Sequence, residues 1–187
     1  MGAKDNLGDA KERARPLLMV DIDGVVSLFG GWERPARERD DRSSGPSPDG
    51  SFHSIEGMPH FLSSIAAAHL LDLSSMFELV WASGWEERAN EHLPHLLGLP
   101  RELPFLRFPR AVGRANAHWK LDTIDAYAGE RPLAWVDDAL NGACHEWAHA
   151  RMAPTLLVQT EPTLGLTARE AAQLAGWAHA LNGAPSR

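Results

Sequence analysis

Two apolar stretches of this sequence each end in a pair of carboxylates. Asp21 and Asp23 lie at the end of the first apolar stretch of the chain, and Asp137 and Asp138 follow a later one. Carboxylates at the end of a buried strand are costly unless a cation or a reaction needs them. For the first pair, an Asx turn that ends an ordinary strand is the alternative. The recurrence of the pattern favours a chemical role.

Four carboxylates at one edge of a fold repel each other strongly, and a low local dielectric strengthens the repulsion. A hard divalent cation with oxygen ligands removes the conflict, and Mg²⁺ fits this donor set. Ser83 ends another apolar stretch, and Lys120 is the sole lysine outside the first fifteen residues. One lysine and one hydroxyl beside the carboxylates suit phosphate. One Asp would attack phosphorus and a second would protonate the leaving oxygen, while the metal and the lysine hold the equatorial oxygens.

Apolar stretches alternate with segments of helical periodicity along the chain. The pattern predicts strands at 17–22, 78–82, 105–108, 132–136 and 155–158. It predicts helices that begin at Pro59 and that span 86–97, 115–127, 139–152 and 167–181, with Thr167 and Glu170 as a capping box for the last. The alternation predicts an α/β fold with a three-layer, Rossmann-like parallel sheet and helices on both faces. Sites in such sheets form outside the carboxyl ends of the strands, where the candidate residues lie.

The chain is long enough for one domain with a full core. Residues 1–15 are predicted to be a flexible tail and residues 16–187 a single domain. The segment 27–57 combines mixed charges with a run of Gly, Pro and Ser, and predicts a long flap or mobile loop with Trp32 over the site.

The composition excludes several function classes. The net charge of −7 argues against broad capture of nucleic acid or anionic membrane. No stretch reaches the roughly 18 apolar residues of a membrane span, so no membrane partner is expected. Cys144 is the single cysteine, which favours a reducing, cytoplasmic setting. The sequence does not predict an oligomeric state.

The chain resembles the haloacid dehalogenase-like (HAD) phosphohydrolases in four motifs that occur in the family's order. The run Asp21-Ile22-Asp23-Gly24-Val25 matches the first motif, D-x-D-x-[TV]. Ser83 after an apolar strand matches the second, and Lys120 matches the third by position. Asp137-Asp138 matches the acidic pair of the fourth.

The resemblance implies Asp21 as the nucleophile and Asp23 as the general acid and then base. It implies that the Asp21 side chain, the Asp23 carbonyl and Asp137 bind Mg²⁺, with Asp138 as a direct or indirect ligand. Ser83, Gly84 and Lys120 would hold the phosphoryl group. The segments 27–57 and 98–114 are too short for a large cap domain, which implies a minimal-cap phosphatase with an open site.

The resemblance implies a phosphorylated substrate, with a small molecule as the first expectation. Nucleotides or nucleic-acid ends are the alternative, because small HAD domains of this kind also accompany RNA-repair proteins. A non-catalytic binding domain that keeps the fold is a third hypothesis. The intact set of acidic residues argues against it.

Other patterns offer competing hypotheses. The run His145-Glu146-Trp147-Ala148-His149 matches the H-E-x-x-H zinc-peptidase motif, with Glu170 as a third ligand. Helical periodicity places its His and Glu residues away from the apolar face, so two surface histidines are preferred. Either Trp32 or Trp85 could stack on a substrate ring. A basic cluster either binds a phosphate-rich substrate or is a solvated loop; its members are Arg107, Arg110 and Arg114.

Overall fold

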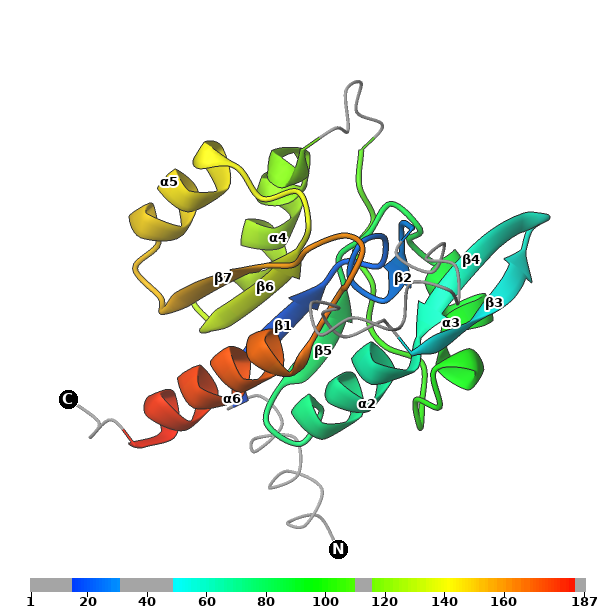
Figure 1. Cartoon of the computed structure of the whole chain (residues 1–187). Coiled ribbons are helices and arrows are strands. Elements are labelled where there is room, and N and C mark those ends of the chain that lie inside the picture. The colour runs from blue at the N-terminus through cyan, green and yellow to red at the C-terminus, as the bar shows by residue number, and fades with distance from the viewer. Residues whose placement is uncertain (1–14, 31–48, 110–115, 184–187) are drawn as a thin grey trace, which may run out of the picture.

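The fold is known from a computed structural model, which describes residues 15–30, 49–109 and 116–183. At its centre is a four-stranded parallel sheet in the order β5-β1-β6-β7. Its strands are β1 (Leu17–Val20), β5 (Glu78–Trp81), β6 (Leu133–Asp137) and β7 (Thr155–Gln159). Because all four strands run the same way, their carboxyl ends meet at one edge (Figure 1). The predicted three-layer α/β fold is therefore confirmed.

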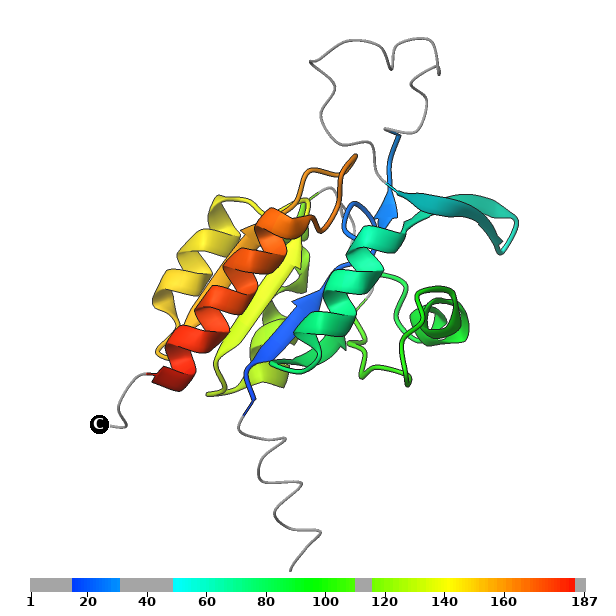
Figure 2. The ribbon, with the colours of Figure 1, turned by 60° about the horizontal axis from the view of Figure 1, so that its bottom comes forward.

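Helices cover both faces of this sheet, as Figure 2 shows. The helices α2 (Ser64–Leu73) and α6 (Ala168–Gly183) lie on one face, and α4 (Leu121–Ala128) and α5 (Gly142–Ala150) on the other. Side chains alternate along each strand, which divides the core into two clusters. Val20 packs in the cluster of α2 and α6, whereas Met19 packs in the cluster of α4 and α5.

A second sheet carries a hairpin that projects beside the main sheet (Figure 1). It is antiparallel, with the order β2-β4-β3, and consists of β2 (Ser27–Leu28), β3 (Gly50–Ile55) and β4 (Met58–Ser63). Glu56 and Gly57 connect β3 to β4 with φ angles of 52° and 81°. Two consecutive positive φ angles in a two-residue loop are typical of a type I′ turn, which suits the twist of paired strands.

The helix predicted to begin at Pro59 is wrong at its start. Residues Met58–Ser63 form β4, and the helix begins only at Ser64, where the Ser63 hydroxyl accepts a hydrogen bond from the Ala66 amide at 3.1 Å. Pro59 is tolerated because β2 pairs only with Phe61 and Leu62, so no strand formed by the described residues lies beside Pro59 on that side. Within the predicted flap 27–57, residues 27–28 form β2 and residues 50–57 form β3 and the turn that leads into β4; Trp32 lies outside the described residues.

Other predicted boundaries shift by a few residues. The segment 105–108 is not a regular strand, but Phe105 forms a parallel bridge with Trp81 at the edge of the sheet. The predicted helix 115–127 is a 3₁₀ turn η2 (Ala117–Lys120) followed by α4, and the helix α3 spans Arg88–Leu96. At the start of α6 the Glu170 carboxylate accepts a hydrogen bond from the Thr167 amide at 3.1 Å, as the capping box requires.

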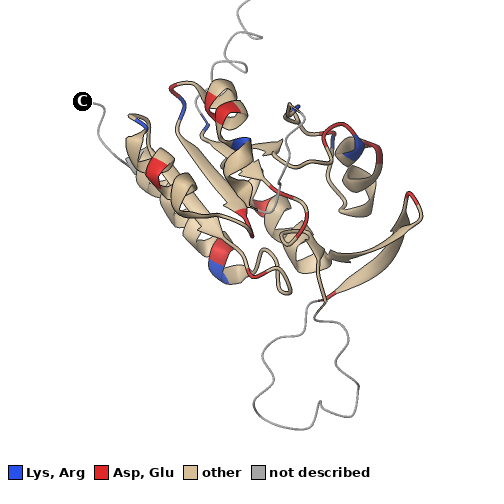
Figure 3. Cartoon of the chain, turned by 90° about the horizontal axis from the view of Figure 1, so that it is seen from above, with Lys and Arg blue, Asp and Glu red and all other residues tan. Residues whose placement is uncertain are grey.

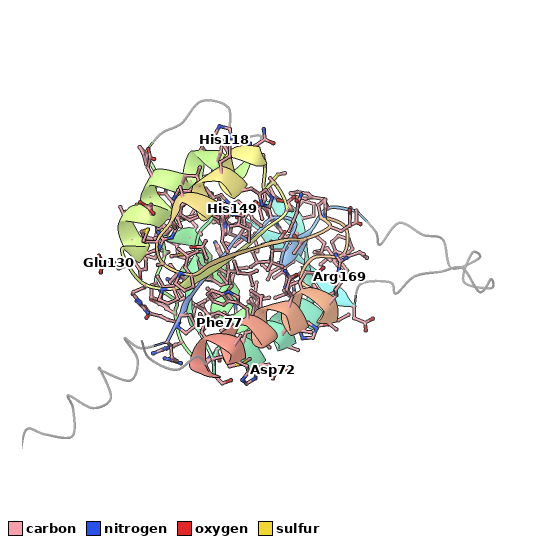
Figure 4. All side chains as sticks on the ribbon, turned by 90° about the vertical axis from the view of Figure 1, so that its left-hand side faces the viewer. Asp72, Phe77, His118, Glu130, His149 and Arg169 are labelled. Atoms are coloured by element: carbon pink, nitrogen blue, oxygen red, sulfur yellow. The ribbon has the colours of Figure 1, made fainter. Side chains whose placement is uncertain are left out.

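Two further features complete the fold. Phe77, labelled in Figure 4, lies beside α6, where its ring stacks on that of Trp177 with ring centroids 6.2 Å apart. Within the described ranges, no helix has the length and apolar character needed to cross a membrane.

Candidate active site

The loop after β1 turns tightly at the carboxyl edge of the sheet. The Ile22 carbonyl accepts hydrogen bonds from three amides that follow it, those of Val25, Val26 and Ser27, at 2.9 to 3.2 Å. Gly24 has a φ of 71°, and a Cβ at this position would lie 2.4 Å from Oδ2 of Asp138. Glycine is required here, because it adopts positive φ freely and lets the two segments approach closely. The turn brings Asp21 and Asp23 towards the end of β6.

Lys120 joins two of the predicted carboxylates. Its Nζ lies 2.9 Å from Oδ1 of Asp21 and 2.7 Å from Oδ2 of Asp137. All three residues are buried. Burial lowers the pKa of Lys120, but attraction to Asp21 and Asp137 outweighs it and the net shift is upward. Lys120 is therefore a buried cation held between two carboxylates, one just after β1 and one at the end of β6.

Asp138 adds a third carboxylate to this group. Oxygens of Asp21, Asp137 and Asp138 lie within 4.8 Å of one another. In Figure 3, viewed from above, acidic segments of separate strands come together near the middle of the molecule. Burial, and then repulsion from Asp21, raises the pKa of Asp137 and of Asp138 to about 6.

This group fits a hard divalent cation. Three carboxylates with one lysine leave a surplus of negative charge, and carboxylate oxygens are the ligands that Mg²⁺ prefers. Among the described residues it is the one group of three or more such side chains that could hold a metal ion. The Asp23 side chain is not part of it, so the prediction that Asp23 binds metal concerns its main-chain carbonyl alone.

The Asp23 side chain is held by an aromatic network instead. The Trp85 indole N–H donates to Oδ2 of Asp23 at 2.9 Å. The His60 ring meets the Trp85 ring edge to face, with centroids 4.9 Å apart, and His60 Nδ1 lies 3.0 Å from the Ser27 hydroxyl. Burial raises the pKa of Asp23, the Trp85 hydrogen bond opposes this rise, and the nearby Asp21 adds to it. A raised pKa keeps Asp23 protonated to higher pH, as a general acid requires.

Ser83 and Gly84 follow β5, the neighbour of β1. Ser83 is buried, and its carbonyl accepts a hydrogen bond from the Glu86 amide at 3.1 Å, which bends the chain back towards α3. The Ala82 amide donates to the Val20 carbonyl at 2.8 Å, so this segment continues the pairing of β5 with β1 up to the site. Ser83 and Gly84 thus lie at the same edge of the sheet as Asp21.

The competing motif on α5 does not form a site. His145, Glu146 and His149 are exposed, and Figure 4 shows His149 on the side of the molecule formed by α4 and α5. Glu170 instead accepts hydrogen bonds from Thr167 and Arg169. The preference for surface histidines agrees with this arrangement.

Two other predictions have mixed outcomes. Trp85 is only 9% exposed and is hydrogen-bonded to Asp23, so it is not free to stack broadly on a substrate. In the basic cluster, Arg107 forms an exposed ion pair of 3.2 Å with Glu87, and Arg110 and Arg114 lie outside the described residues.

Sequence reasoning missed the network behind Asp23. Ser27 and His60 belong to elements whose pairing was not predicted, so no spacing rule connects them to Asp23. The one signal available is the position of Trp85 two residues after Ser83. Thr160 was also missed; its hydroxyl donates to the Gly24 carbonyl at 2.8 Å and supports the turn.

A family model matches most of this chain. The model of the HAD domain in Swiss Army Knife RNA repair proteins matches residues 17–171, from β1 into α6, and covers every candidate site residue. A search of curated proteins found no match. The matched span confirms the resemblance to HAD phosphohydrolases. The chain belongs to the family of HAD domains found in Swiss Army Knife RNA repair proteins.

Proposed function

We propose that this HAD domain is a Mg²⁺-dependent phosphomonoesterase that acts through a phosphorylated Asp21. The observation that carries the proposal is the buried contact between Asp21 and Lys120 at 2.9 Å, beside the acidic pair Asp137 and Asp138. A buried carboxylate in contact with a lysine is suited to act as a nucleophile, because the lysine also attracts the phosphoryl oxygens.

In the first step a carboxylate oxygen of Asp21 attacks phosphorus, and the bond between phosphorus and the leaving oxygen breaks. The Asp23 carboxylic acid gives its proton to that oxygen. In the second step Asp23, now a carboxylate, takes a proton from water as the water oxygen attacks phosphorus. The acyl phosphate bond breaks, which releases phosphate and restores Asp21. Ser83, Gly84 and Lys120 bind the phosphoryl oxygens in both steps.

Asp21, Asp137, Asp138 and the Asp23 carbonyl are the groups that would hold Mg²⁺. When bound, the ion supplies positive charge to the phosphoryl oxygens. The surplus of carboxylates over lysine in the site supports this assignment.

A phosphate at an RNA end is the substrate that the family description favours. The net charge of −7 argues against a long electrostatic contact with nucleic acid, so we expect recognition of the end rather than of an extended strand. A small-molecule phosphomonoester is the second candidate, because the site needs only the phosphate and its leaving oxygen.

The test is phosphate release by the full chain with Mg²⁺ from 3′- and 5′-phosphorylated oligoribonucleotides, nucleotides, sugar phosphates and p-nitrophenyl phosphate. We expect Asp21→Asn to lower turnover on the order of a thousandfold or more, because the nucleophile is lost. The exposed Asp122→Asn is the matched control, and circular dichroism checks that both variants fold. Undiminished turnover by Asp21→Asn refutes the mechanism. Binding of phosphate or Mg²⁺ without turnover of any substrate would favour a binding domain.

A further inference from the structure

A small cavity lies between the hairpin β3–β4 and the helix α3. Its volume is about 170 Å³. Ile55 and Met58 line it from the hairpin, and His92 lines it from α3. Glu56 at the tip of the hairpin forms an ion pair of 2.8 Å with Arg88 at the start of α3, which connects the two sides of the cavity. Sequence reasoning gave this cavity no role.

One of the residues that line the cavity also contacts the proposed general acid, Asp23. His60 and Trp85 both line the cavity, and the Trp85 indole N–H is bonded to Asp23. Asp23 must face the leaving oxygen, so the leaving group lies on the side of the site where Trp85 stands. Because Trp85 both lines the cavity and contacts Asp23, a group attached to that oxygen can extend towards the cavity.

The lining suits a flat ring with polar edges. Ile55 and Met58 offer apolar surface, whereas His60, His92 and Arg88 offer hydrogen-bonding groups. Nε2 of His92 is buried and has no hydrogen-bond partner in the described part of the chain. Such an atom is costly unless something binds it. Arg88 is already paired with Glu56, so no unpaired arginine in the lining calls for a second phosphate.

The volume limits what can enter. Pockets for drug-sized ligands have volumes of about 300 Å³ or more. A cavity of about 170 Å³ instead suits one ring system. An apolar body with donors and acceptors at its rim is the chemistry of a nucleobase. A free sugar would need a polar lining on all sides.

We propose that this cavity is the leaving-group subsite and that it binds the nucleobase of the terminal nucleotide, with His92 Nε2 as a hydrogen-bonding partner. The inference rests on the proposed function and names the part of the substrate that the protein selects.

The kinetic test compares adenosine monophosphates, phosphorylated at the 3′ or 5′ position, with ribose 5-phosphate, which lacks the base. His92→Phe keeps a ring but removes the nitrogen. We expect it to raise KM for the nucleotides about two- to tenfold, the effect of one hydrogen bond, with kcat and the ribose 5-phosphate rates unchanged. Met58→Trp fills the cavity from an exposed position (Met58 is 63% exposed), so it should fold and raise KM further. His95→Phe, on the exposed side of α3, is the matched control.

A binding test separates the subsite from the chemistry. Adenosine without phosphate is titrated into ¹⁵N-labelled full chain, and the Trp85 indole N–H signal, assigned with Trp85→Phe, is followed. We expect this signal to shift in the wild type and to stay still in Met58→Trp.

Equal changes in KM for nucleotides and ribose 5-phosphate, or no change for either, would overturn the subsite. So would an indole signal that responds to inorganic phosphate but not to adenosine. Both results leave the phosphatase itself intact. Turnover by Asp21→Asn would instead overturn the proposed function, whereas the adenosine titration would still report on the cavity.

Discussion

The acidic group at the ends of β1 and β6 and the histidine motif on α5 both contain residue types that bind metals, but their surroundings differ. Asp21, Asp137 and Lys120 are buried and come from three separate segments, and Lys120 contacts both carboxylates. His145 and His149 are exposed on a single helix. Burial makes an ionised group costly, so buried charges that converge need a compensating partner, whereas exposed ones need none. Convergence with burial, rather than a short motif, indicates a site.

Metal removal is the strongest test of this contrast. We expect EDTA to abolish phosphate release and Mg²⁺ to restore it, because the surplus carboxylates repel both each other and the substrate. A variant with both His145→Ala and His149→Ala should keep full activity and the full response to Mg²⁺. Activity that is equal in EDTA removes the metal from the proposal, and a loss in the double variant gives α5 a role that its exposure does not suggest.

Lys120→Met should lower the free energy of unfolding as well as the phosphatase activity. It leaves Asp21 and Asp137 buried without their cation, and breaking such a pair costs about 3–5 kcal/mol. Arg107→Met breaks an exposed pair with Glu87, where water screens the charges, so we expect almost no loss of stability. Urea unfolding in EDTA measures both. Equal free energies of unfolding for the two variants would mean that the buried triad is not a structural unit.

Trp85→Phe tests the general acid Asp23 without changing the nucleophile Asp21. Without the indole N–H, Asp23 loses its anchor, so we expect turnover of alkyl phosphomonoesters to fall about tenfold, within the range of general acid catalysis. Turnover of p-nitrophenyl phosphate should change little, because p-nitrophenolate leaves without a proton. Steady-state kinetics on both substrates provides the measurement. Equal losses would indicate that Trp85 supports the fold of the site rather than the acid.

The smallest expected effect is that of Asp138→Asn on thermal stability, and it depends on pH. Burial, together with repulsion from Asp21, raises the pKa of Asp138 to about 6 in the fold, above the ordinary value for a carboxyl group of about 3.9. Its ionisation therefore destabilises the Mg²⁺-free fold above pH 6, and this cost disappears as the pH falls towards 4. In EDTA, Asp138→Asn should raise the Tm by a few degrees at pH 7.5 and by little at pH 4.5.

The exposed Glu146→Gln is the control for this series, and a difference in Tm that does not vary with pH would contradict the assignment. With Mg²⁺ present the sign should reverse, because the variant loses a proposed ligand.

The strands of the main sheet were predictable because each is an apolar run that ends in polar residues, as β1 and β6 show. The hairpin was not. Pro59, Phe61 and Leu62 have spacing that also suits a helix, and this spacing alone does not distinguish the two structures. The Glu56-Gly57 turn shows that a hairpin signal was present in a form weaker than Asn-Gly.

The residues of the candidate site were predictable from the sequence, but the contacts between their side chains were not. Asp21, Ser83, Lys120 and Asp137 follow from strand ends and from the scarcity of lysine, although their roles remain predictions. The network from Ser27 through His60 and Trp85 to Asp23 joins three separate elements. Contacts of this kind depend on how the hairpin packs, which the order of residues in a single chain does not reveal.

Gly24 shows how narrow the tolerances of this site are. Its α-carbon faces the Asp138 carboxylate so closely that even one methyl group would displace an oxygen. The spacing between two segments more than a hundred positions apart is thus set by the absence of a side chain. Any replacement at this position would therefore press on the Asp138 carboxylate and alter the acidic pair, although Gly24 itself has no chemical role.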